Sequence, residues 1–323
     1  MKFALFSGLG GTAWSDLLDT WRHLDATGWD AACVTDHFMP NTKDRVGDTL
    51  ECWTALAALA AETRRMRVGT IVSGNTYRHP AVLAKMATNI DIISGGRLIC
   101  GMGAGWQENE HKAYDIPFYT VGERLARLDE ACQMLKLLWT QPKSTWKGKY
   151  YALDDAPHDP KPVQKPYPEL MVGGGGEKVT LKIAAKHADH WNVWGGPNTL
   201  AAKGKILEGH CATVGRDPKT ILRSAVMVLA MTDDAAEMER CDRSTARAWA
   251  RTRKRPATPC WPGARRRSRT RSAACAMPAW GCCSSPASSS APARRRRSTA
   301  SSPRWRPRSA ERAARHGRGS PHR

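Results

Sequence analysis

The sequence predicts an α/β fold of the (β/α)8 TIM-barrel type, and three observations predict it. Short, unbroken apolar runs typical of buried strands alternate with stretches whose apolar residues recur at helical spacing. Buried strands joined by helices imply a parallel sheet. The chain holds seven such strand runs before its composition changes, and an eighth would close a barrel.

Each predicted element follows from its own pattern. Residues 51–63 place Trp53, Leu56 and Ala60 at helical spacing, whereas residues 68–72 and 98–102 are unbroken β-type runs. The seven predicted strands cover residues 3–6, 31–35, 68–72, 98–102, 170–172, 191–194 and 224–231. Helices are predicted at residues 14–26, 51–63, 121–138, 177–187 and 200–213, with a further helix beginning at Pro80 and Gly28 ending the first.

The chain changes character near residue 240. Residues 240–323 carry 23 of the 50 Lys and Arg but only Asp242 and Glu311 of the 30 acidic residues, so they hold the whole basic excess. They contain no Leu, Ile, Val, Phe or Tyr, and therefore cannot bury enough apolar surface to offset chain entropy. We divide the chain into a TIM-barrel domain at 1–239, with strands one to seven, and an Arg/Ala/Ser/Pro-rich disordered tail at 240–323.

Two interpretations of this tail are open. Its arginine runs and four tryptophans fit a nucleic-acid-binding arm, which would neutralise phosphates and stack on bases. The leading interpretation is instead a frameshift, because arginine outnumbers lysine 22 to 1 and Ala, Ser, Pro and Cys fill the rest. Joining the last letter of each codon to the first two of the next lets residues 276–283 spell Asp-Ala-Gly-Val-Gly-x-Leu, with Ala, the second Gly and Leu forced. That segment has the character of the missing eighth strand.

The sequence also leads to expectations about the cellular location of the protein and about metal binding. No signal-length apolar stretch follows Met1 and no run approaches the ~20 apolar residues of a membrane span, so we expect a cytoplasmic protein without membrane partners. The body cysteines Cys33, Cys52, Cys100, Cys132 and Cys211 lack metal-type spacing. We expect reduced core thiols and propose no metal site.

The first candidate site motif is Asp36-His37, which follows a buried strand. Active groups of a parallel barrel lie at the carboxyl ends of its strands, so both residues point to the barrel mouth. A histidine there can give or take a proton near neutral pH, and a carboxylate can orient it. The alternative is structural: Asp36 caps the loop and His37 packs against Phe38.

Two further motifs follow later strands. In residues 73–80, Gly74 and Asn75 tolerate unusual backbone angles, and Arg78 meets an anion or, in the slightly favoured interpretation, is a solvated loop cation. Residues 173–178 put four glycines between a strand and a helix, where backbone N–H groups can approach a phosphate. A glycine turn without a ligand is the alternative, but late barrel strands often hold phosphates.

Together these motifs resemble a known family. Residues 1 to about 238 are similar to the bacterial luciferase-like flavin and deazaflavin oxidoreductases, and most closely to the coenzyme F420-dependent branch of actinobacteria. The matching stretches are residues 35–38, 74–80, 94–98, 103–106, 173–178 and 188–192.

The resemblance implies a site and a chemistry. The cofactor ring would lie over the end of the third strand, at a bulge with a non-proline cis peptide at Ile71-Val72, and its phosphate on the glycine turn. His37 takes the place of a catalytic histidine in the sugar-phosphate dehydrogenase branch. Asn41 and Trp106 replace a tryptophan and a glutamate of that branch, which argues against a sugar phosphate. The predicted cofactor-binding residues are Asp36, Ile71, Val72, Ser73, Asn75, Ala104, Gly105, Gly173, Gly174, Gly175, Gly176, Glu177 and Lys178.

The sequence therefore predicts a hydride-transferring oxidoreductase that uses coenzyme F420 on a small organic substrate. The alternatives are an FMN-dependent luciferase-like monooxygenase, nucleic-acid binding through the basic tail, and a barrel disabled by loss of its eighth strand. Members of the family are commonly homodimers, which makes a homodimer the expected assembly.

Overall fold

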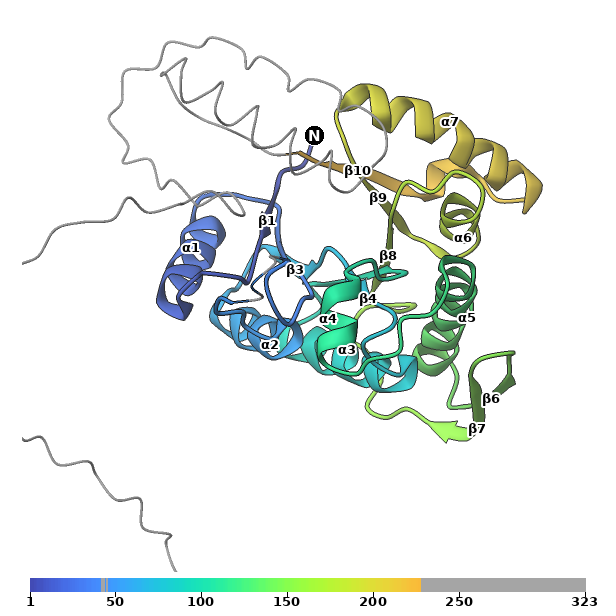
Figure 1. Cartoon of the computed structure of the whole chain (residues 1–323), viewed down its shortest axis with the longest axis horizontal. Coiled ribbons are helices and arrows are strands. Elements are labelled where there is room, and N and C mark those ends of the chain that lie inside the picture. Colours follow the sequence, from blue (N-terminus) through green and yellow to red (C-terminus); the bar gives the residue numbers. More distant parts are fainter. Residues whose placement is uncertain (42–43, 45, 228–323) are drawn as a thin grey trace, which may run out of the picture. The chain divides into compact units, whose positions relative to one another are not determined.

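The computed structural model describes residues 1–41, 44 and 46–227, and its main element is a parallel sheet. The strands are hydrogen-bonded in the order β1-β2-β3-β5-β8-β9-β10, and the two-residue strand β4 also pairs with β5 (Figure 1). Their bounds are β1 Ala4–Ser7, β2 Ala31–Val34, β3 Arg67–Thr70, β4 Ser73–Gly74, β5 Leu98–Gly103, β8 Glu169–Gly173, β9 His190–Trp194 and β10 Leu222–Val226.

Helices connect these strands as barrel topology requires. They are α1 Trp14–Ala26, α2 Cys52–Glu62, α3 Pro80–Ser94, α4 Glu108–Ala113, α5 Val121–Thr140, α6 Thr180–His187 and α7 Pro197–Thr213. The short 3-10 helix Pro218–Thr220 precedes β10. An antiparallel hairpin of β6 (Lys143–Lys147) and β7 (Ala152–Pro157) lies between α5 and β8 in the chain. It forms a sheet of its own, separate from the main sheet.

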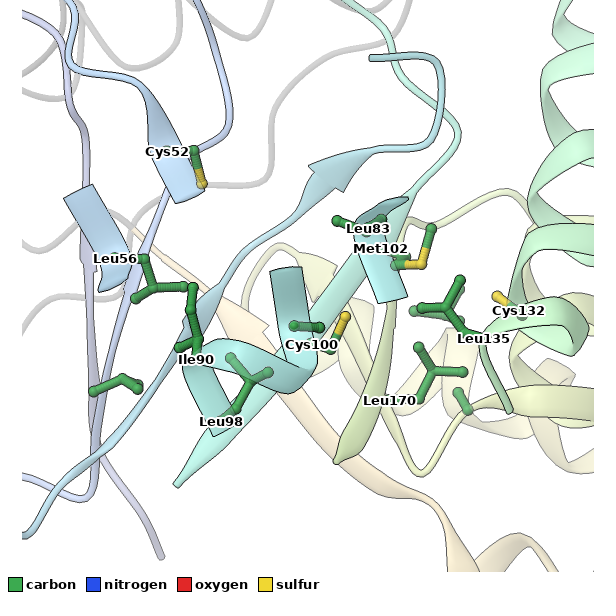
Figure 2. Close-up of a cluster of buried hydrophobic side chains, with 14 of the residues drawn as sticks. Cys52, Leu56, Leu83, Ile90, Leu98, Cys100, Met102, Cys132, Leu135 and Leu170 are labelled. Atoms are coloured by element: carbon green, nitrogen blue, oxygen red, sulfur yellow. The ribbon is translucent and has the colours of Figure 1, made fainter. Parts of the chain in front are cut away.

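Strand β5 shows how side-chain alternation builds the two parts of the core. Leu98, Cys100 and Met102 are buried in the large cluster between sheet and helices, as Figure 2 shows. The intervening Ile99 packs instead with Ala31 and Met171 in a smaller cluster inside the curved sheet. Burying one such side chain stabilises the fold by about 1.5–3 kcal/mol.

The five cysteines of the described residues belong to this core. All are free thiols and all are buried. Burial raises the pKa of Cys33 to about 12, and burial also raises that of Cys132 to about 12. Neutral, buried thiols confirm the prediction of reduced core cysteines.

The fold confirms the predicted class and all seven strands, with shifted boundaries. Helix α1 matches its predicted bounds, and α3 begins at Pro80. Helix α6 begins at Thr180, later than predicted, and α7 begins earlier, at Pro197. Helix α4 and the β6–β7 hairpin were not predicted from the sequence.

The two ends of the described sheet are β1 and β10. Both are more exposed than the central strands, with Leu222 at 50%. The sheet nevertheless curves far enough for the rings of Phe6 on β1 and Trp194 on β9 to meet at 5.5 Å. The predicted eighth strand, the tail and the nucleic-acid arm lie outside the described residues.

Candidate functional site

The carboxyl ends of β2, β3 and β5 carry most of the candidate site. Strand β2 leads into Asp36 and His37, and β3 leads into the Ile71-Val72 peptide and β4. The pairing of β4 with β5 sets Gly74 beside Gly103, just before the loop of Ala104 and Gly105. The parallel topology thus gathers three predicted motifs at one edge of the sheet.

A buried ion pair holds the loop after β2. The Asp36 side chain is fully buried and accepts two hydrogen bonds from the Arg78 guanidinium, at 2.7 and 3.2 Å. The Ser73 hydroxyl also donates to this carboxylate, and Arg78 further pairs with Glu51. Arg78 is only 12% exposed. The interpretation of Arg78 as a solvated cation is therefore wrong, because its positive charge neutralises the buried Asp36.

The same bonds bear on Asp36 and Ser73 as predicted cofactor ligands. The Asp36 carboxylate is occupied by Arg78 and Ser73, and the Ser73 hydroxyl also accepts from Trp53 Nε1 at 3.1 Å. These hydrogen bonds fix the orientation of both side chains.

His37 is held by a second carboxylate that the sequence did not indicate. Its Nδ1 lies 2.7 Å from Oε1 of Glu110, a fully buried residue of α4. The backbone N–H of Phe38 donates to Oε2 at 2.8 Å, and the Tyr77 hydroxyl donates to Oε1. Burial by itself would raise the pKa of Glu110, but these hydrogen bonds hold it below the usual value, so the carboxylate is ionised.

Aromatic side chains surround this pair. The His37 ring meets Trp106 edge-to-face at 5.5 Å, and Trp106 is 53% exposed. Phe38 and Tyr77 pack at 4.9 Å between centroids. The partners of the His37 ring include Glu110 and Trp106.

His111 ties the loop after β4 to helix α4. The Gln107 carbonyl can only accept, so His111 Nδ1 donates to it at 2.7 Å and Nε2 accepts from the Thr76 hydroxyl at 2.7 Å. Gly105 lies against the same threonine with φ of +78°, and an added Cβ would come within 2.7 Å of Thr76 Oγ1. A side chain at Gly105 would push these loops apart.

The end of β3 forms an apolar floor. The Ile71-Val72 peptide is cis, which confirms the geometry implied by the family resemblance. A Cβ on Gly103 would lie 2.6 Å from Val72 Cγ2, and one on Gly173 would lie 2.7 Å from Val72 Cγ1. Because Gly103 and Gly173 have no side chains, Val72 has room between β5 and β8.

Asn75 borders this floor and carries an unpartnered acceptor. It is 2% exposed, and its backbone N–H donates to the Gly103 carbonyl at 2.9 Å. Its side-chain Oδ1 is buried without a hydrogen-bond partner among the described residues. Such an atom is costly unless a ligand donates to it. Gly74 and Asn75 could tolerate unusual backbone angles, but neither has a positive φ. Glycine is required at position 74 because an added Cβ would lie 2.5 Å from the Tyr77 ring.

The glycine turn leaves β8 as predicted. Gly173 and Gly174 are half-buried, and the chain becomes exposed from Gly176 through Lys178 before α6. Gly174 has φ of +136°, its N–H donates to the Asn192 carbonyl at 2.9 Å, and its carbonyl accepts from Trp191 Nε1 at 2.9 Å. These bonds fix the turn while leaving it open to solvent.

A lysine from α7 adds positive charge to this turn. Lys203 Nζ donates to the Gly175 carbonyl at 2.7 Å and to Glu177 Oε1 at 2.9 Å, and its side chain is 13% exposed. An ammonium group beside backbone N–H groups and a helix start favours an anion. Glu177 points its carboxylate at Lys203, which opposes direct binding of a phosphate by that side chain.

Glu110 and Lys203 are the site residues that sequence reasoning missed. Glu110 lies four residues after Trp106, in the segment that follows a predicted strand. This position was the only feature of the sequence that could have marked it as a site residue. Lys203 lies within a predicted helix, where a lysine is normally solvated, and gave no signal.

Within the described residues, the structure shows neither a metal-binding cluster nor a membrane-spanning helix. No group of three or more His, Cys, Asp and Glu is placed to hold a metal ion there. None of the helices within the described ranges is long and apolar enough to cross a bilayer.

Comparison with known proteins agrees with this geometry. The model of the luciferase-like monooxygenase family matches residues 1–276. The chain belongs to this family. An F420-dependent secondary alcohol dehydrogenase in complex with an F420-acetone adduct is similar in structure, with a TM-score of 0.63, 25% identity, and coverage of 70% of this chain and 68% of that one.

Sequence relatives fall on both cofactor branches. An F420-dependent glucose-6-phosphate dehydrogenase of Amycolatopsis mediterranei is 33% identical over 54% of this chain and 51% of its own length. An FMNH(2)-dependent dimethylsulfone monooxygenase of Pseudomonas putida is 29% identical over 54% and 49%. An uncharacterized protein, Rv0953c, of Mycobacterium tuberculosis is 32% identical over 54% and 60%. The matches span about half of the length of these curated relatives.

Proposed function

We propose that the protein is an oxidoreductase that uses coenzyme F420 to transfer a hydride to or from a small organic substrate. The observation that carries the proposal is that the His37–Glu110 pair and the Ile71-Val72 peptide follow the carboxyl ends of the neighbouring strands β2 and β3. A flat cofactor ring over the floor at Val72 would lie at this edge of the sheet, where the loop of His37 also begins. A proton donor or acceptor beside a hydride acceptor is what such a reaction requires.

The residues present suit a deazaflavin or flavin. Asn75 Oδ1 is a buried acceptor that a ring N–H would satisfy, and the glycine turn with Lys203 suits the phosphate end. A bound deazaflavin supplies a ring carbon in place of the reactive flavin nitrogen, so it exchanges two electrons as hydride and reacts poorly with oxygen. His37 then gives or takes the substrate proton at Nε2, beside the ring of Trp106.

FMN-dependent oxygen chemistry is the second candidate. The relationship to the dimethylsulfone monooxygenase favours it, and both cofactors carry a phosphate for the same turn. The preference for F420 rests on the F420-dependent relatives, which is an argument from analogy.

Equilibrium titration of the purified full chain with oxidised F420 and with FMN, followed by fluorescence, tests the choice. We expect tighter binding of F420. Tighter binding of FMN, with oxygen consumption once it is reduced, would overturn the F420 proposal and support the monooxygenase.

A separate experiment tests whether the glycine turn binds the phosphate end of the cofactor. Alanine cannot readily adopt φ of +136°, so Gly174→Ala should distort the turn and weaken binding of either cofactor about tenfold or more. Gly28→Ala is the matched control, because Gly28 also has positive φ, at +88°, but ends α1 in open space. Equal binding by the two variants would remove the turn from the cofactor site.

A further inference from the structure

The contacts of Glu110 determine which nitrogen of His37 carries a proton. An ionised carboxylate has no hydrogen to donate, and its Oε1 lies 2.7 Å from His37 Nδ1. The hydrogen in this contact therefore lies on Nδ1. In the neutral ring, Nε2 must then carry the lone pair.

The geometry points to Glu110 as a positioning residue that locks His37 in the Nδ1–H tautomer, so that Nε2 is the atom that exchanges the substrate proton. This inference rests on the proposed function for the role of Nε2 but not for the tautomer itself. Glu110 contacts His37 rather than the substrate, so its effect on turnover passes through the histidine.

The other contacts of Glu110 also fix the position of its carboxylate. Its Oε2 accepts from the Phe38 backbone N–H at 2.8 Å, and a backbone N–H has no alternative role. The Tyr77 hydroxyl donates to Oε1, alongside His37. Glu110 is fully buried, and therefore has no water to replace a lost partner.

This arrangement predicts an unusual effect of Glu110→Gln. Glutamine has one acceptor oxygen and one donor nitrogen, and the Phe38 N–H requires the oxygen. The amide NH2 must then face His37 Nδ1, which has to accept. The substitution should invert the tautomer, placing the hydrogen on Nε2 and removing the lone pair that serves as base.

Nitrogen-15 NMR of the labelled full chain measures this directly, at a pH where the ring is neutral and with His37→Ala to assign the signal. We expect the Nδ1–H tautomer in the wild type and the Nε2–H tautomer in Glu110→Gln. Glu62→Gln, which alters an exposed carboxylate paired with Arg22, is the matched control and should leave the signal unchanged. A wild-type ring in the Nε2–H tautomer would overturn the inference without any variant having to fold.

Kinetics then separates the inference from the proposed function. Glu110→Gln should lower kcat by ~10²–10⁴-fold with little change in cofactor affinity, and the double variant with His37→Ala should be no slower than His37→Ala alone. Tyr77→Phe removes a donor but keeps the His37 contact, so its tautomer should remain wild type. If the full chain shows the expected tautomers but no F420 turnover, the proposed function fails while the positioning role stands. Unchanged kcat in a Glu110→Gln protein that does turn over would refute the positioning role.

Discussion

At the scale of single residues, the site contains two buried carboxylates with different partners. Asp36 is matched by a permanent cation, Arg78, whereas Glu110 is matched by a histidine, a phenol and a backbone N–H. In the first arrangement, the arginine neutralises the buried charge of Asp36. In the second, the carboxylate orients His37, to which we assign the proton exchange in the proposed reaction. One carboxylate therefore holds the loop, and the other holds its histidine.

The Arg78 guanidinium can be tested by its effect on stability. Removing one member of a buried ion pair leaves the other charge without compensation, so Arg78→Met should lower the free energy of unfolding by about 3–5 kcal/mol. Arg22→Met is the control, because the Arg22–Glu62 pair is exposed and such pairs contribute about 0–1 kcal/mol. Denaturant titration of both variants measures the difference, and equal losses would mean that the Asp36 pair is not energetically special.

His37 is tested by turnover. A positioned general acid or base typically contributes ~10²–10⁴-fold to rate, so His37→Ala should slow turnover by that order. Cofactor affinity should change little, because the ring floor is built by Val72, Gly103 and Gly173. Steady-state kinetics and a cofactor titration on the same protein make the check. Wild-type turnover by the variant would reduce His37 to a packing residue.

At the scale of elements, the hairpin after α5 introduces a pH-sensitive contact. His158 follows β7, is 2% exposed, and its Nε2 lies 2.8 Å from the Thr88 hydroxyl of α3. Burial, and then the charges of Lys85 and Lys161, lower its pKa from 6.5 to about 4, with Asp159 acting in the opposite direction. Folded His158 therefore binds fewer protons than unfolded His158 between these values.

The sign of the effect on stability follows from this difference. Above pH 6.5 both states are neutral and His158 adds no pH dependence; as pH falls from 6.5 to about 4 the unfolded state gains protons and stability drops. The full loss corresponds to about 3 kcal/mol. Unfolding of His158→Gln should depend less on pH across this window. His23→Gln, at an exposed position of α1, should behave as wild type, and parallel pH curves for His158→Gln and wild type would contradict the assignment.

Sequence reasoning located the strands well because their apolar runs are forced by burial on both faces. Strand β5, for example, is buried at every position, and no other local structure suits such a run. The hairpin was not predicted because residues such as Lys143, Thr145 and Lys147 are exposed and give no apolar signal. Helix α4 has only six residues, too few to show a helical period.

The backbone features of the site could be predicted from the sequence, but the hydrogen-bond partners of its residues could not. Strand ends and glycines mark loops directly in the sequence, which placed His37, Gly105 and the turn at Gly174. Some of their partners lie far away in the sequence: Lys203 is 28 residues from Gly175, and Glu110 is 73 residues from His37. Nothing local distinguishes those side chains from solvated ones, so Arg78 was given the wrong role.

At the scale of the whole molecule, the open question is what completes the barrel between β10 and β1. The described sheet ends on these two strands. Exposed edges of parallel strands invite association with other chains, and barrels avoid this only by closing. A protein of this family with a complete eighth strand would therefore be more stable and less prone to aggregate than one without it.

We propose that a shift of reading frame near codon 240 replaced that strand. The basic residues of 240–323 are almost all arginine, and the shifted codons over residues 276–283 force Ala, Gly and Leu within Asp-Ala-Gly-Val-Gly-x-Leu. Restoring the frame should yield an amphipathic helix, an apolar strand beginning near that segment, and a last helix. The corrected protein should be more soluble and should bind F420 more tightly than the chain as encoded.

Resequencing the gene around codon 240 and limited proteolysis of the encoded chain together test this proposal. We expect a missing or additional nucleotide, and rapid cleavage within residues 240–323, because a segment without Leu, Ile, Val, Phe or Tyr cannot form its own core. An intact frame with a protease-resistant tail would reject the shift. Salt-dependent DNA binding that disappears when residues 240–323 are deleted would then assign the arginine runs to phosphate contacts, since such binding weakens steeply as salt rises.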